Sequence, residues 1–183
     1  MGFNASYLAF HGVRREEILA LMEFEDTGIE DEAREADFSI ADMPTGWTIL
    51  WSSQCEYLPD SEPLHLPFRC RHSIVGCCVL ETTMMSIGFG YDYDDQGKMY
   101  NRWNISHEAA KGHDNLECIG TLPPESRAII EAARAEAGTR TNVDVFFDIP
   151  VSVIESLTGF RYDRPVYDGE EIVFTELRSL ATA

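Results

Sequence analysis

Basic residues are scarce in this chain of 183 residues. It contains 14 lysines and arginines against 32 aspartates and glutamates, which gives a formal net charge of -18 at pH 7. A surface this negative repels nucleic acid and anionic membranes and attracts basic proteins or cations. We therefore expect no nucleic-acid partner and no membrane partner, and a basic protein is the favoured partner class. A purely solubilising role for the acidity is the open alternative.

Long apolar runs and a secretory signal are both missing. No segment approaches the ~18 uninterrupted apolar residues that span a bilayer, and the N-terminus lacks a basic region followed by an apolar one. The cysteine count is odd, which together with the missing signal argues for reduced thiols rather than a disulfide framework. We expect a soluble, cytoplasmic protein with free thiols at Cys55, Cys70, Cys77, Cys78 and Cys118.

Signatures of the common enzyme classes are also missing. The chain has no G-x-S-x-G elbow, no P-loop and no G-x-G-x-x-G after a predicted strand. A Cys-His-acid arrangement can be assembled in so many ways from three cysteines and five histidines that it has no specificity. These absences favour a protein that is not an enzyme, although they leave the question undecided.

Three segments resemble metal sites without completing one. His107 and His113 are six residues apart across a glycine-containing loop, whereas H-E-x-x-H places two histidines four apart on one helix face. The segment from Cys70 to Cys78 lacks the second cysteine pair of a structural zinc site. The calcium-loop pattern that starts at Asp92 has Trp103 where a bidentate glutamate is required. We therefore expect no metal and no cofactor.

The segment 77–107 predicts a long antiparallel hairpin at the centre of the sheet. Apolar and β-branched residues lead into a turn at 94–97, and apolar residues continue after it. A second hairpin is predicted at 38–51, and further strands at 3–10, 116–122, 143–147 and 172–174. Helices are predicted near 14–25, 124–137 and 149–158, with a short one at 64–74, and 27–37 is predicted to be a loop or a poorly anchored helical turn. Residues 1–183 are thus expected to form a single α+β domain, a mainly antiparallel sheet with three or four helices packed on it.

Half of the net negative charge lies in one short segment. Residues 16–37 contain ten acidic residues and a single basic one, Arg34. We interpret this segment as the surface that binds a basic partner, with the acidic residues Glu23, Glu25, Asp26, Glu30, Asp31 and Glu32 as its candidates.

The size, the acidity and the mixed order of strands and helices are similar in general texture to bacterial immunity proteins, which neutralise toxins. That resemblance implies a small, acidic binding or inhibitor protein whose partner is a basic protein. The alternative is a small enzyme of unknown reaction at the loop that holds His107, Glu108, His113 and Asp114. There His107 is the general base, and Glu108 or Asp114 orients it. The oligomeric state is left open.

Overall fold

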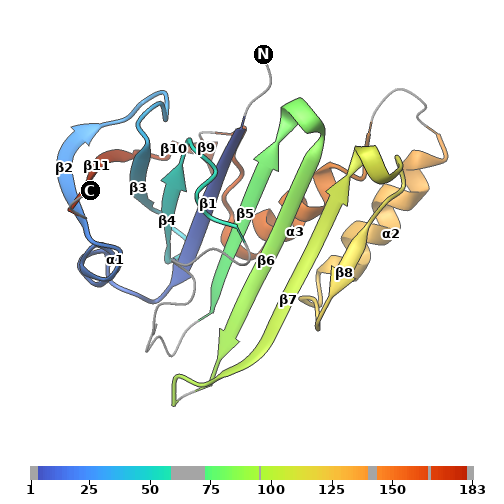
Figure 1. The fold of residues 1–183 in the computed structure, drawn as a ribbon, viewed down its shortest axis with the longest axis horizontal. Helices are drawn as coiled ribbons and strands as arrows, with labels where there is room; N and C mark the ends of the chain where they lie inside the picture. Colours follow the sequence, from blue (N-terminus) through green and yellow to red (C-terminus); the bar gives the residue numbers. More distant parts are fainter. Residues whose placement is uncertain (1–3, 59–72, 95, 140–143, 165, 181–183) are drawn as a thin grey trace.

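The computed structural model describes residues 4–58, 73–94, 96–139, 144–164 and 166–180. They form a nine-stranded sheet in which every pair of neighbours is antiparallel (Figure 1). From one edge to the other the strands are β2 (Phe24–Glu30), β11 (Thr175–Ser179), β3 (Phe38–Asp42), β4 (Trp47–Ser52), β1 (Asn4–His11), β5 (Ile74–Leu80), β6 (Met85–Tyr93), β7 (Met99–Glu108) and β8 (Glu117–Ile119).

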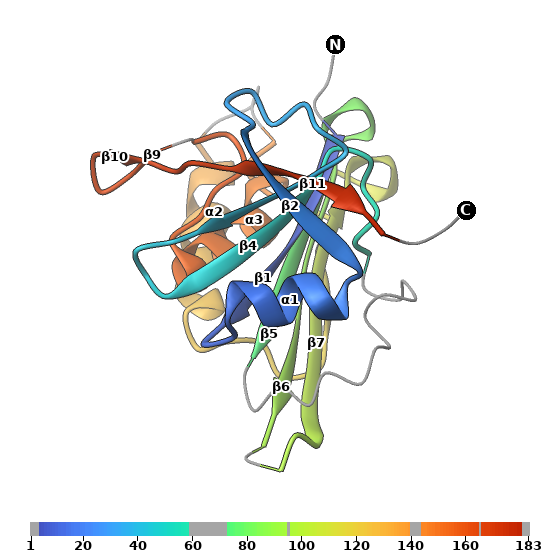
Figure 2. The same cartoon turned by 90° about the vertical axis from the view of Figure 1, so that its left-hand side faces the viewer.

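Helices cover both faces of this sheet. On one face lie α2 (Ser126–Ala137) and α3 (Asp148–Thr158), and on the other lies α1 (Arg15–Leu21) (Figure 2). All six residues of β4 are buried, as expected for a strand that is covered on both sides. Two apolar layers result, one under α3 that includes Trp51, Trp103 and Ile154, and one under α1 that includes Leu8, Phe10 and Ile18.

The hairpin is shorter than predicted and is not central. It consists of β6 and β7, whereas residues 77–80 belong to β5, and β1 occupies the middle of the sheet. The chain reverses between β5 and β6 through a 3-10 turn, Glu81–Thr83, followed by Met84 in the left-handed region with φ 49°. Because this turn contains neither glycine nor proline, the sequence gives no signal for it.

Three further predictions need correction. The predicted loop at 27–37 begins inside β2, an edge strand that pairs with β11 through backbone hydrogen bonds and needs no apolar stripe. Of the predicted strand at 143–147, residue 143 lies outside the described residues, and 145–147 form a turn whose apolar side chains fill the core before α3 begins. The final strand is β11, a few residues after the predicted 172–174.

The remaining elements are close to expectation. α2 and α3 begin and end within two residues of the predicted ranges, while α1 is shorter than the predicted 14–25. β8 covers the middle of the predicted strand 116–122. The helix predicted at 64–74 falls mostly outside the described residues. A 3-10 turn, Ala109–Lys111, follows β7, and β9 (Val166–Tyr167) and β10 (Glu170–Glu171) form a separate small hairpin.

Two glycines on β6 leave space for neighbouring groups on the face of the sheet that α3 covers. Gly88 faces the backbone oxygen of Pro150 in α3, and Gly90 faces the ring of Trp103 on β7. The sheet therefore approaches α3 closely at Gly88, and it accommodates the large indole of Trp103 at Gly90. Within the described part of the chain, none of the helices is long and apolar enough to cross a membrane.

Candidate functional site

The acidic segment lies along one edge of the sheet. β2 is the outermost strand there, and Glu23, Glu25, Glu30 and Glu32 are exposed on it or beside it. Asp31 differs from its neighbours because its side chain is buried, and its Oδ1 accepts a hydrogen bond from the backbone N–H of Glu35 at 3.0 Å. The predicted candidates therefore share one region of the surface, with Asp31 turned into the protein.

Two of these carboxylates are already paired within the protein. Arg178 on β11 donates to Glu25 Oε2, and Arg15 Nη2 donates to Asp26 Oδ2 at 2.6 Å. Partial burial works against ionisation of Asp26, but the backbone N–H of Gly28 and the Arg15 guanidinium outweigh it and lower its pKa. No ion pair is recorded among the described residues for the other three exposed carboxylates, Glu23, Glu30 and Glu32. We call these three the edge carboxylates.

The alternative site does not form one cluster. The ring of His107 is completely buried, with Nδ1 2.6 Å from the Asn115 carbonyl oxygen and Nε2 3.0 Å from Asp144 Oδ2. His113 and Asp114 are exposed on the loop. Both ring nitrogens of His107 are thus engaged by protein oxygens, so the ring ties β7 to two later segments. Glu108 forms a 2.9 Å ion pair with Lys111 instead of orienting the ring.

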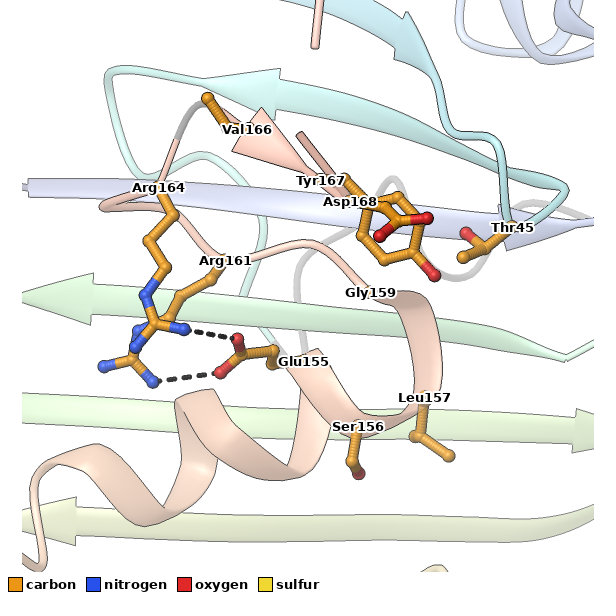
Figure 3. Close-up of a pocket in the computed structure, with 10 residues that line it drawn as sticks. All are labelled: Thr45, Glu155, Ser156, Leu157, Gly159, Arg161, Arg164, Val166, Tyr167 and Asp168. Carbon is orange, nitrogen blue, oxygen red and sulfur yellow. Dashed lines mark hydrogen bonds and ion pairs between the residues drawn. The ribbon is translucent and has the colours of Figure 1, made fainter. Parts of the chain in front are cut away.

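A cavity of about 470 Å³ lies beside the end of α3, and it contains two arginines (Figure 3). Glu155 accepts hydrogen bonds from both Arg161, at 3.2 Å, and Arg164, at 3.0 Å. Arg161 also donates to Asp148 and Asp163, each at 2.8 Å. Burial lowers the pKa of Arg161, but the three carboxylates outweigh it and raise the pKa overall. Because carboxylates already satisfy this guanidinium, it fastens α3 to the segment after it.

A second cavity, of about 450 Å³, is lined mainly by apolar and aromatic residues, and we call it the aromatic pocket. It lies between the turn end of the β6–β7 hairpin and residues 121–125, which lead into α2. Its lining comprises Trp47, Ser73, Val75, Asp92, Tyr100, Asn101, Trp103, Thr121, Leu122, Pro123, Pro124, Glu125 and Leu157. Among the described residues of this lining none is basic, whereas two, Asp92 and Glu125, carry carboxylates.

Asp92 is held in place at this pocket. Ser73 Oγ donates to its Oδ1 at 2.9 Å, and Asn101 Nδ2 donates to its Oδ2 at 2.9 Å. Asn101 also donates to the Thr121 carbonyl oxygen at 3.0 Å, which links the hairpin to the segment before α2. Each carboxylate oxygen keeps further lone-pair capacity, so Asp92 can accept from a ligand without losing these bonds.

The sequence did not identify this pocket. Its lining residues come from segments that are far apart in the sequence, so no local pattern indicates that they meet. Within the described residues, no group of three or more histidines, cysteines, aspartates or glutamates could hold a metal ion. Cys70 lies outside these residues. No family model, no curated protein and no solved structure matches the chain.

Proposed function

We propose that the chain is a small acidic binding protein of the cytoplasm, of the immunity or inhibitor type, that engages a basic protein. The observation that carries the proposal is the set of edge carboxylates on one side of a chain of net charge -18: Glu23, Glu30 and Glu32 are exposed and, among the described residues, unpaired. Their charge is available to an incoming partner, whereas Glu25 and Asp26 are neutralised locally by Arg178 and Arg15.

The physical role of these charges is long-range attraction. At physiological salt the Debye length is about 8 Å, so exposed charges act mainly during approach and are weakened as salt is added. Complementary charge of this kind raises association rates and excludes wrong partners more than it adds affinity. The tight part of the contact must then come from buried or aromatic anchors.

The test is affinity capture from the native cell lysate with three forms of the protein, at about 50 mM and about 500 mM salt. The first form is the wild type. The second replaces the edge carboxylates, E23Q/E30Q/E32Q. The third is a control with the same change in net charge, E117Q/E131Q/E136Q, which removes three exposed carboxylates from β8 and α2, two of them ion-paired within the protein.

We expect the wild type and the control to retain one basic protein in about equimolar amount at low salt and to release it at high salt. The edge variant should retain much less of it. Capture of an acidic protein, capture that salt does not change, or equal losses in both triple variants would contradict the proposal.

A further inference from the structure

The aromatic pocket combines an apolar lining with an oriented carboxylate. Ligand sites are typically apolar cavities with a few fixed polar groups that set orientation. Here the fixed polar groups are Asp92, bonded to Ser73 and Asn101, and the amide of Asn101 itself. Leu122, Pro123 and other apolar side chains supply most of the remaining wall. Such a site suits a ligand with an apolar stem and a polar, positively charged head.

The charge of the pocket lining determines which charge the head of the ligand carries. Asp92 and Glu125 both line the pocket, none of the described residues in its lining is cationic, and the whole chain is strongly acidic. An anionic ligand would be repelled by the net charge on approach and by the two carboxylates at contact. A cation gains from the overall field on approach and from Asp92 at contact.

The shape of the carboxylate site favours guanidinium over ammonium. Both oxygens of Asp92 are fixed by neighbours at 2.9 Å, so the carboxylate plane is set before a ligand arrives. A planar guanidinium donates two parallel N–H bonds to such a carboxylate, whereas lysine meets it as a point charge. The three-carbon stem of arginine can pack on apolar and aromatic walls at the same time.

We propose that the aromatic pocket holds an arginine side chain of the basic partner, with Asp92 as the residue that binds its guanidinium. This inference rests on the proposed function, and it supplies the anchor that exposed carboxylates cannot provide. The edge carboxylates then govern how fast the partner arrives, and the pocket governs how long it stays.

The first experiment uses three capped tripeptides, Gly-Arg-Gly, Gly-Lys-Gly and Gly-citrulline-Gly, titrated into the full chain. The readout is the set of indole N–H signals in a proton–nitrogen correlation spectrum. Trp47 and Trp103 line the pocket, whereas Trp51 is stacked with Tyr7 at a centroid distance of 6.2 Å in the core and is the internal reference. Citrulline keeps the shape of arginine and removes its charge.

We expect the arginine peptide to shift the signals of Trp47 and Trp103 saturably, with a Kd on the order of 1 mM for a single side chain. Lysine should bind several-fold more weakly, and citrulline at least about tenfold more weakly, because the charge-assisted bonds are lost. Equal binding of arginine and citrulline, or no saturable shift at about 10 mM peptide, would overturn the proposal.

Variants of pocket residues test whether the arginine peptide binds in the aromatic pocket. Asp92→Asn keeps the side-chain shape and should weaken the arginine peptide about tenfold. Glu170→Gln, which removes an exposed charge on β10 outside the pocket lining, should change it less than twofold. If Asp92→Asn disturbs the hairpin, Tyr100→Ala is the second variant, since Tyr100 is 69% exposed at the pocket and its loss should weaken the peptide about threefold. Wild-type affinity in both variants would refute the assignment.

The proposed function and the proposed arginine site can be refuted independently. With the captured partner, Asp92→Asn should raise the dissociation rate about tenfold, and the edge variant should mainly lower the association rate. If a salt-released basic partner is captured but the arginine peptide does not bind, the anchor is wrong and the proposed function stands. If the peptide binds and no basic partner is captured, the proposed function fails, and the identification of the arginine as a partner's fails with it.

Discussion

The indole of Trp103 lies directly over Gly90, its cross-strand partner on the β6–β7 ladder. A Cβ added at Gly90 would stand 2.5 Å from both Nε1 and Cε2 of that ring. No side chain larger than hydrogen fits between the strand and the indole in this arrangement. The aromatic pocket therefore depends on a glycine that is not part of its lining.

Gly90→Ala should destabilise the fold by about 1 to 3 kcal/mol, because the indole or the strand must move. Urea unfolding followed by tryptophan fluorescence measures this. The matched control is Gly138→Ala at the end of α2, where an added Cβ meets its nearest atom at 3.6 Å and the effect should be within about 0.5 kcal/mol. Equal stability of the two variants would show that the close approach does not constrain the sheet.

Arg161→Met should cost about 1 to 3 kcal/mol. The substitution removes a nearly buried guanidinium that carries three ion pairs and leaves Asp148, Glu155 and Asp163 without their shared cation. The exposed pair of Arg127 with Glu131 is the control, because Arg127→Met should cost no more than about 0.5 kcal/mol. Thermal unfolding of both variants gives the comparison, and similar losses would mean that the Arg161 network is not structural.

Native thiol reactivity should differ strongly among the cysteines. A hydrogen bond from the Cys78 thiol lowers the pKa of the half-buried Cys55, whereas burial raises the pKa of Cys77 to about 12. Alkylation with iodoacetamide near neutral pH, mapped by mass spectrometry, should modify Cys55 about a hundredfold faster than Cys77. In urea the two should react at similar rates. Faster native modification of Cys77 would contradict the buried environment.

Asp26 should contribute to the pH dependence of stability. Its pKa is lower in the folded protein, so its stabilising effect is fully present above the unfolded value near 3.9 and is lost as pH falls through the folded value. Asp26→Asn should therefore be less stable than wild type at neutral pH, and the difference should shrink in acid. Urea unfolding at several pH values tests this. Glu30→Gln, exposed and unpaired among the described residues, should match wild type within about 0.5 kcal/mol at neutral pH.

Local capping and turn residues account for the elements that the sequence predicted well. Pro123 and Gly138 bracket α2, Gly159 ends α3, and Asp94 caps the hairpin turn by accepting from the backbone N–H groups of Gln96 and Lys98. These signals act within a few residues, so they can be read from the chain alone.

Long-range pairing accounts for what the sequence could not predict. β2 is held by β11, about 150 residues later, and its acidic sequence gives no strand pattern. Asp31 resembles its exposed neighbours in sequence, yet its side chain is buried. The aromatic pocket joins Trp47, Asp92 and Leu157, whose proximity follows only from the order of the strands and the position of α3.

The claim that charge guides a basic partner to this chain is tested most directly by the association rate constant of the captured partner, measured by stopped flow as a function of ionic strength. We expect the rate constant to fall at least about tenfold between about 50 mM and about 500 mM salt, with a much shallower dependence for E23Q/E30Q/E32Q than for E117Q/E131Q/E136Q. An association rate that salt does not change, or one that both triple variants alter equally, would contradict it.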